Sequence, residues 1–471
     1  MTDPVMVGIA SIPERADALR HTLESIAPQA DQVFLSLNDY PAEPAWLDQF
    51  PNVTATVRPV NDGDAEKFAA VDDWDGIVVT CDDDLIYPAD YITTLLAGLD
   101  RHGHDKIVGF HGGKTLGFNG AHLAATHKQI RCLGELEADD VDVNVLGTGA
   151  LAFDARFVPV WRDLFRSPNM ADVYLACHAH RFGIPMVALA HKAGWLQNIC
   201  PAEGRRIYES NRSGDGTLCD TRARRELEMN SIDWTAEPRR PRIRVSIATC
   251  NRSHLLSGLL DDLVRESRSI ELEVAVYEDP ADHDYTLVRM IADEVGWQWH
   301  RFDRRLGRDK HCDLVTRELQ DCRSSSVDWF VFLPDDVRLI RHALPRAIET
   351  WQLLDQPAAL TLWRLKNHEG QMNWTGLVPV EREHAFEIFH VDGLYLCRRD
   401  TLAFLDFRCP PVPTLRGRTS SGVGRAMSIA LHRAGKRMYR VKKSLAVPVS
   451  DVASEMNPDA RDRRFHPWVY L

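Results

Sequence analysis

The chain repeats its own pattern, in the same order, over two stretches of about 230 residues. Residues 5–26 (VMVGIASIPERADALRHTLESI) and 243–264 (IRVSIATCNRSHLLSGLLDDLV) both run from an apolar β-rich segment, through a polar loop, into a helical pattern. Further parallels follow: QVFLSLNDY with LEVAVYEDP, GIVVTCDDDLIYPADYITTLL with WFVFLPDDVRLIRHALPRAI, VLGTGALAFDARFVPV with HVDGLYLCRRDTLAFL, and HAHRFGIPMVALAH with ALHRAGKRMYRVKK. A repeat this long is a whole domain, so we expect an internal duplication.

Length leads to the same expectation. The chain has 471 residues, 44% of them hydrophobic, and a single core stops growing at about 250 to 300 residues. The Pro- and Arg-rich stretch TAEPRRPR (235–242) is typical of a linker. We therefore predict two domains, residues 1–237 and 238–471.

Within each copy, strand and helix patterns alternate, which predicts βαβ units. The fold class expected is α/β, with two tandem Rossmann-like domains, each built on a mostly parallel sheet. Ligands of such sheets bind beyond the carboxyl ends of the strands.

Three adjacent acids follow one of these strands. The apolar run Ile77–Thr80 leads through Cys81 into Asp82, Asp83 and Asp84. A hard divalent cation, Mg²⁺ or Mn²⁺, relieves the repulsion of such carboxylates and commonly also takes substrate phosphate oxygens. The pattern indicates a diphosphate site, and the alternative is a solvated acidic turn.

Composition excludes several other classes of protein. No apolar run approaches the roughly 20 residues that a membrane span requires, and no basic segment precedes a hydrophobic one at the N-terminus. The ten cysteines lack the spacings of a zinc site or a disulfide scaffold, so we expect a cytoplasmic protein. The net charge of −12 resides in an acidic first half, whereas the second half is weakly basic.

Several motifs together carry a family resemblance. They are VGIASIPER, NDY, GDAEKF, CDDDLIYPADY, GFHGG, VLGTGALAF and PNMADVY. Over most of residues 5–200 the chain resembles GT-A-fold glycosyltransferases of the family-2 type, which use nucleotide-diphosphate sugars as donors.

The resemblance implies roles for particular residues. The residues that the resemblance implies for donor binding are Ala10, Ser11, Pro13, Arg15, Asn38, Asp39, Lys67, Asp82 and Asp83. Asp82 and Asp84 match the family's DxD motif, with Asp84 as the direct ligand of Mn²⁺ or Mg²⁺. His191 stands where some members place a third metal ligand, although a lone histidine is commonly structural. His111 and Lys114, near glycines 109, 112 and 113, would face the acceptor or the donor phosphates.

The resemblance also implies a reaction. Asp172, in NMADVY, stands where inverting members place the general base that takes the proton of an acceptor hydroxyl. We expect inversion at the anomeric carbon, with a retaining outcome as the alternative. The acceptor is either a glycan or a hydroxymethylated base in DNA.

The second copy departs from this pattern. Asp335 and Asp336 align with Asp83 and Asp84, but Pro334 replaces Asp82. Gly424 stands opposite Asp172 and Lys443 opposite His191, so we expect a degenerate or acceptor-binding domain.

Two other interpretations remain open. Lys310 parallels Lys67, which favours a retained nucleotide site and hence a bifunctional enzyme. Alternatively, both copies form a sugar- or nucleotide-binding protein without catalysis.

Overall fold

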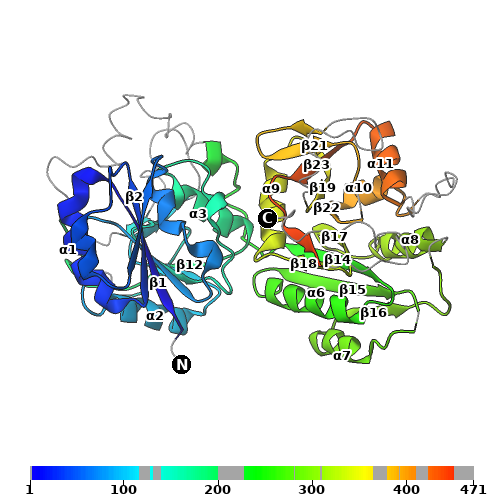
Figure 1. The fold of residues 1–471 in the computed structure, drawn as a ribbon, viewed down its shortest axis with the longest axis horizontal. Helices are drawn as coiled ribbons and strands as arrows, with labels where there is room; N and C mark the ends of the chain where they lie inside the picture. Colours follow the sequence, from blue (N-terminus) through cyan, green and yellow to red (C-terminus); the bar gives the residue numbers. More distant parts are fainter. Residues whose placement is uncertain are drawn as a thin grey trace. The chain divides into compact units, whose positions relative to one another are not determined.

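The computed structural model describes residues 3–115, 128–130, 139–199, 227–280, 282–307, 310–363, 379–391, 393–409 and 423–449. The chain divides into two compact units, Met1–Arg240 and Pro241–Leu471 (Figure 1). We call them unit 1 and unit 2. None of the helices in the described ranges combines the length and apolar character needed to cross a membrane.

Unit 1 contains one large sheet with small additional sheets. Its strands are β1 (Val5–Ser11), β2 (Gln32–Asn38), β3 (Val53–Arg58), β4 (Ile77–Cys81), β5 (Leu85–Ile86), β6 (Ile107–Gly109), β7 (Gly112–Lys114), β8 (Lys128–Ile130), β9 (Val141–Val143), β10 (Val145–Leu146), β11 (Ala150–Asp154), β12 (Met186–Ala188) and β13 (Gln197–Asn198). Its α-helices are α1 (Ala16–Ile26), α2 (Tyr91–His102) and α3 (Ala171–Arg181). Its 3₁₀ helices are η1 (Pro13–Arg15), η2 (Ala27–Gln29), η3 (Ala45–Gln49), η4 (Gly63–Phe68), η5 (Val71–Asp73) and η7 (Arg162–Leu164).

The large sheet has the order β3-β2-β1-β4-β11-β6-β12-β9. Strands β3, β2, β1 and β4 are parallel, β11 and β9 run in the opposite direction, and β6 and β12 are parallel to each other. Ile9 of β1 is in register with both Leu35 and Cys81. The carboxyl ends of β1, β2 and β4 therefore meet at one edge of the sheet.

Helices cover both faces of this sheet. Val7 and Ile9 of β1 share one core with Leu19 and Leu23 of α1, and Leu95 of α2 belongs to the same core. On the other face, η4 lies directly against β1, because a Cβ on Gly8 would be 1.9 Å from the carbonyl oxygen of Lys67. Figure 1 shows α1 and α3 on opposite sides of β1 and β2. Glycine at position 8 thus allows η4 to bring Lys67 onto the sheet.

Unit 2 contains a nine-stranded sheet. The strands of this sheet are β14 (Arg242–Thr249), β15 (Glu271–Glu278), β16 (Gln298–Arg301), β17 (Trp329–Pro334), β19 (Pro357–Thr361), β20 (Val380–Glu381), β21 (Ala385–Ile388), β22 (Tyr395–Cys397) and β23 (Arg437–Val441). Two further strands, β18 (Val337–Leu339) and β24 (Ala446–Pro448), form a separate two-stranded sheet. Its helices are α6 (Ser253–Glu266), α7 (Thr286–Val295), α8 (His311–Asp321), α9 (Ala343–Gln352), α10 (Arg399–Phe404) and α11 (Val423–Arg433).

The two large sheets follow the same path. The sheet of unit 2 has the order β16-β15-β14-β17-β22-β19-β23-β21-β20. The first eight strands of this order, counted across the sheet, succeed one another along the chain as the eight strands of unit 1 do. Each also runs in the same direction as its counterpart. In both units a short strand after the acids pairs with a late strand, β5 with β13 and β18 with β24. The carbonyl of Asp84 accepts from the Ile199 N–H, and that of Asp336 from the Val449 N–H, each at 2.9 Å. This common path supports the internal duplication, which we continue to propose.

Candidate functional site

An arginine lies between the acids that follow β4. The strand is fully buried, and Asp83 at its end is 3% exposed. The Nη1 of Arg15, at the end of η1, donates to the Oδ1 of Asp83 at 2.7 Å and lies 3.4 Å from the Oδ2 of Asp84. The guanidinium therefore supplies the positive charge that two neighbouring carboxylates need.

The surroundings of Asp83 differ from those of a solvated turn. Burial raises the pKa of Asp83 to about 6, against the opposing effects of Arg15 and a hydrogen bond from Ser11. The hydroxyls of Ser11 and Tyr40 lie 3.3 Å apart, and the Tyr40 hydroxyl donates to the carbonyl of Ile12 at 3.0 Å. These contacts fasten the loop after β1 to the tip of β4.

Asp82 has a different partner. The ammonium of Lys67, on η4, forms an ion pair with the Oδ1 of Asp82 and lies 3.5 Å from the carbonyl oxygen of Thr148. The Lys67 side chain is 6% exposed, whereas that of Asp82 is 42% exposed. Burial alone would neutralise both groups, but their mutual attraction outweighs it, raising the pKa of Lys67 and lowering that of Asp82. Both groups are therefore charged at neutral pH.

The backbone around Asp82 is held by Tyr87 and Gly149, to which the sequence motifs assigned no individual role. The N–H of Asp82 lies 2.8 Å from the Tyr87 hydroxyl, which donates in turn to the Gly149 carbonyl at 2.8 Å. A Cβ on Gly149 would lie 2.0 Å from the Oδ2 of Asp82. Glycine at 149 thus leaves room for the Asp82 carboxylate. In the sequence, only the GTG motif (147–149) indicated a need for glycine here.

Asn38 and Asp39, expected to contact the nucleotide, lie at the end of β2. Asn38 is 2% exposed and donates to the carbonyl of Gly63 at 3.2 Å, which connects β2 to η4. Asp39 is exposed, has a positive φ of 60°, and accepts from Asn61 at 2.8 Å. Ala10, near the end of β1, and Pro13, the first residue of η1, belong to the same expected set and are partly exposed.

Asp172 lies at the start of α3, close to η4. It is the second residue of the helix and is partly exposed, and its Oδ1 accepts from the Val173 N–H at 2.9 Å. The preceding Ala171 N–H donates to the Oδ2 of Asp64 on η4 at 3.1 Å. One short helix, η4, thus carries Lys67 and also holds the start of α3.

His191 follows β12 and is 7% exposed. Its Nδ1 lies 2.9 Å from the carbonyl oxygen of Leu189. Because a carbonyl only accepts, Nδ1 is the donor of this hydrogen bond, so Nε2 is the ring atom that would serve as a metal ligand. The ring also packs edge-on against Phe110, at 5.7 Å between centroids.

His111 and Lys114 lie on the segment after β6. The carbonyl of His111 accepts from the Gly147 N–H at 2.7 Å, and a Cβ on Gly147 would be 2.8 Å from the His111 ring. His111 is also close enough to contribute to the lowered pKa of Asp82, after Lys67 and Arg15. Lys114 is exposed at the end of β7.

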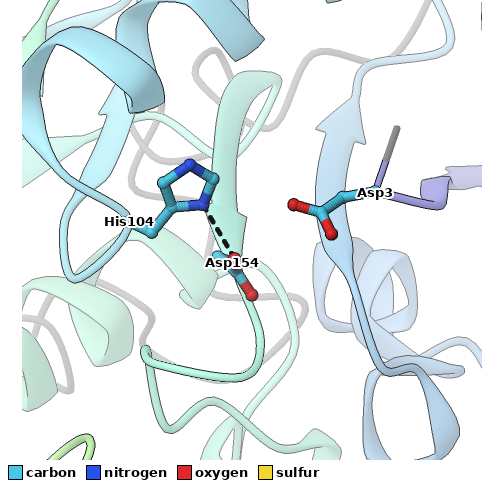
Figure 2. A group of neighbouring side chains, drawn as sticks. All are labelled: Asp3, His104 and Asp154. Atoms are coloured by element: carbon cyan, nitrogen blue, oxygen red, sulfur yellow. Dashed lines mark hydrogen bonds and ion pairs between the residues drawn. The ribbon is translucent and has the colours of Figure 1, made fainter. Parts of the chain in front are cut away.

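A different trio of side chains has metal-like spacing. Within the described ranges, Asp3, His104 and Asp154 place ligand atoms within 4.8 Å of one another, and Figure 2 shows His104 hydrogen-bonded to Asp154 with Asp3 nearby. Arg156 already bridges the two acids, with its Nη2 2.7 Å from Asp3 and 2.5 Å from Asp154. Asp154 pairs with Ile77, where β4 begins. This trio is therefore an arginine-centred ion cluster at the opposite edge of the sheet.

The acids at the end of β4 do not form a three-ligand cluster of that kind in the described chain, with or without His191. They still fit a hard cation, because Mg²⁺ and Mn²⁺ typically bind one or two carboxylates and complete their coordination with phosphate oxygens and water. Asp84, whose side chain is 16% exposed, is the most suitable of them, since Asp82 pairs with Lys67 and Asp83 is buried.

Unit 2 contains the same arginine arrangement. The Nη1 of Arg252 lies 3.0 Å from the Oδ1 of Asp335 and 2.7 Å from the Oδ2 of Asp336. Thr249 donates to Asp335 at 2.8 Å, and its hydroxyl lies 2.8 Å from that of Tyr285. Burial raises the pKa of Asp335 to about 6, as it does for Asp83. This arrangement repeats that of unit 1. Thr249 corresponds to Ser11, Tyr285 to Tyr40 and Arg252 to Arg15, each beside its pair of acids.

The lysine part of the site is not repeated. Pro334 ends β17 at the position of Asp82, and Lys310 is exposed, directly before α8. The environment of Lys310 therefore differs from that of the buried Lys67. Gly424 is the second residue of α11, as Asp172 is of α3, and Lys443 follows β23.

Comparison with known proteins leaves the family open. No protein-family model and no curated protein matches the chain. Among solved structures, Staphylococcus aureus TarS 1–349 is 14% identical with a TM-score of 0.32, over 45% of this chain and 61% of that one. The same protein in complex with UDP-GlcNAc is 15% identical with a TM-score of 0.34, over 46% and 60%.

A third structure is a mannosyltransferase, PcManGT from Pyrobaculum calidifontis, in complex with GDP-Man and Mn²⁺. It is 18% identical with a TM-score of 0.32, over 49% of this chain and 60% of that one. This chain thus spans less than two thirds of the length of each of these structures. At such identities and TM-scores, the likenesses do not establish a shared fold or activity.

Proposed function

We propose that unit 1 is a metal-dependent glycosyltransferase that moves a sugar from a nucleotide-diphosphate sugar to an acceptor hydroxyl. The observation that carries this proposal is the charged cluster at the carboxyl end of β4. There Lys67 pairs with Asp82, and Arg15 lies between Asp83 and Asp84. In α/β sheets of this kind, ligands bind at that edge.

Each charged residue has a role in this proposal. Asp84 offers its carboxylate to Mn²⁺ or Mg²⁺, with His191 as a further ligand. The cation, when bound, supplies Lewis-acid stabilisation of the departing nucleoside diphosphate. Asp82 orients the buried Lys67 ammonium toward the donor, and Asp83 with Arg15 fixes the end of β1 and the following η1, which carry Ser11 and Pro13.

Asp172 is the proposed general base. Its place at the start of α3, beside η4, and its partial exposure suit a carboxylate that accepts the proton of an attacking hydroxyl. Direct displacement with such a base inverts the anomeric carbon. Replacing Asp172 with Asn should lower the transfer rate by roughly 10²- to 10⁴-fold while donor binding is retained.

We propose that unit 2 is a degenerate copy that contributes to acceptor binding. The absence of counterparts to Asp82 and Asp172 supports this, since Pro334 and Gly424 can neither pair with a lysine nor take a proton. The acid pair with Arg252 supports the bifunctional alternative. A two-site enzyme requires that Asp84→Ala and Asp336→Ala remove different transfer activities.

The proposed function is tested by donor turnover without an acceptor. A screen of common nucleotide-diphosphate sugars with Mn²⁺ should show slow hydrolysis of one donor, and a chelator should abolish it. Calorimetric binding that is independent of metal, without turnover across a panel of acceptors, would instead favour a non-catalytic binding protein.

The salt dependence of acceptor binding distinguishes the two possible acceptors, a glycan and a hydroxymethylated base in DNA. Binding to DNA releases counterions and weakens steeply as salt rises, whereas a neutral glycan shows little dependence. Measuring acceptor affinity at two salt concentrations separates the two.

A further inference from the structure

Two cysteines of unit 2 lie together at the start of α8. Cys312 is the second residue of this helix, and Thr316 lies one turn further on the same face. The N–H of Cys409 donates to the Oγ1 of Thr316 at 3.1 Å. The chain at residue 409 therefore runs along the face of α8 that carries Cys312, and each thiol lies close enough to shift the pKa of the other.

This contact makes the two thiols chemically unequal. The hydrogen bond from Cys409 lowers the pKa of Cys312 to about 7, although burial and Asp313 oppose the shift. The same hydrogen bond, with burial and the nearby Glu318, raises the pKa of Cys409. The first turn of a helix also favours a thiolate. Cys312, which is partly exposed, thus has the character of an attacking thiolate, with a buried thiol beside it.

Other described cysteines lack this character. Cys250 is also partly exposed, but burial raises its pKa to about 11. Burial likewise raises the pKa of Cys81 and of Cys322 to about 12. Such thiols are poorly suited to make the first attack on a peroxide at neutral pH.

We propose that Cys312 and Cys409 form a reversible disulfide in response to hydrogen peroxide or another small hydroperoxide. The Cys312 thiolate attacks the peroxide, whose O–O bond breaks, giving Cys312 sulfenic acid and hydroxide. The Cys409 sulfur then attacks the Cys312 sulfur, loses its proton and displaces the hydroxyl group as water. Two thiols lose two electrons in total, and one peroxide is reduced.

The disulfide would connect the start of α8 to residue 409 and close a loop of about 100 residues. A cross-link over so long a loop restricts the unfolded chain, so the oxidised form of unit 2 should unfold at a higher temperature than the reduced form. This inference is independent of the proposed glycosyltransferase activity.

The test is peptide mapping of the full chain after titration with hydrogen peroxide. The expected result is a Cys312–Cys409 peptide that has lost two hydrogen atoms, forms before the other cysteines are oxidised, and disappears with dithiothreitol. The proposal is overturned if both cysteines remain separately alkylatable, or if Cys312 proceeds to sulfinic acid without cross-linking. Because this mapping uses the unaltered protein, it does not depend on a variant that folds.

Variants separate the role of Cys312, which attacks the peroxide, from that of Cys409, which attacks the sulfenic acid. In Cys409→Ser, Cys312 should accumulate sulfenic acid that a 1,3-dione probe traps. In the matched control Cys250→Ser, the cross-link should form at the same peroxide concentration as in the unaltered chain. Equal dione labelling of Cys312 in the unaltered chain and in Cys409→Ser would show that Cys409 does not resolve the sulfenic acid.

Discussion

The Lys67 ammonium and the Asp82 carboxylate form an ion pair at the carboxyl end of β4, with the lysine 6% and the aspartate 42% exposed. This asymmetry has a measurable consequence. Asp82→Asn leaves a buried ammonium without its carboxylate partner, which should cost roughly 2–4 kcal/mol of unfolding free energy in unit 1. Lys67→Met leaves only a carboxylate that water can reach, so it should cost less.

A double-mutant cycle measures the pairing. The double variant that carries both Asp82→Asn and Lys67→Met should be more stable than the single variant Asp82→Asn. Hydrogen exchange of the backbone amides of β1 and β4 measures this difference. Lys310→Met, at the exposed lysine of unit 2, is the matched control and should change stability by less than about 0.5 kcal/mol. Equal costs for Asp82→Asn and Lys310→Met would contradict the structural role of the pair.

Gly149 gives a steric test of the same carboxylate. Gly149→Ala places a Cβ 2.0 Å from the Oδ2 of Asp82 and so should push the carboxylate away from Lys67. We expect a loss of about 1–3 kcal/mol in unfolding free energy and weaker donor binding. Gly393→Ala should be nearly neutral, because within the described ranges no atom outside its chain neighbours lies within 4 Å of the added Cβ. Thermal unfolding and calorimetry of donor binding measure both variants. A neutral Gly149→Ala would show that the carboxylate moves at no cost.

Arg15 should compete with a metal ion for the acids. Arg15→Gln removes the guanidinium that lies 2.7 Å from Asp83 and 3.4 Å from Asp84. Calorimetry without donor should then show Mn²⁺ binding tightened by about tenfold, or 1.4 kcal/mol. Adding Asp84→Asn to Arg15→Gln should remove the gain. Unchanged or weaker Mn²⁺ binding in Arg15→Gln would argue against a cation at Asp84.

Much of the architecture follows from hydrophobic pattern, but the pairing of charges does not. The apolar run Ile77–Thr80 predicts a buried strand, and β4 spans Ile77–Cys81. The DxD resemblance assigns Asp82 and Asp84 to one metal, whereas Asp82 contacts Lys67 from a distant helix. That contact depends on η4 packing over Gly8, a tertiary approach that no local periodicity encodes.

Arg15 is a similar case. The resemblance predicts a nucleotide contact for this residue, and in the structure it donates to Asp83. The corresponding pairs in unit 2, Arg252 with Asp335 and with Asp336, were also not evident from the aligned repeats. The arginines sit at slightly different distances from the ends of β1 and β14, so only the folded loops bring them to equivalent places.

Glu318 should make the stability of unit 2 depend on pH. It is 4% exposed, and burial raises its pKa to about 8. Between the unfolded value, about 4.3, and pH 8, the folded state holds a proton that the unfolded state has lost. Stability from this group is therefore complete below about pH 4 and falls as pH rises, by at most about 1.4 kcal/mol per pH unit.

Glu318→Gln should flatten this decline, as measured by denaturant unfolding of unit 2 at pH 5 and pH 7. The exposed Glu294→Gln is the control and should keep the slope of the unaltered chain. Identical slopes in all three proteins would show that Glu318 ionises normally in the folded state.

The central claim is that the acids after β4 hold a cation that in turn holds the diphosphate of a nucleotide sugar. Its most direct test is calorimetry of nucleoside diphosphate binding, with and without Mn²⁺, in Asp84→Asn and in the matched Asp336→Asn. We predict that Mn²⁺-dependent binding is lost in Asp84→Asn and retained in Asp336→Asn. If Asp84→Asn keeps Mn²⁺-dependent binding of the nucleoside diphosphate, the assignment of the site to unit 1 is contradicted, whether Asp336→Asn loses this binding or also keeps it.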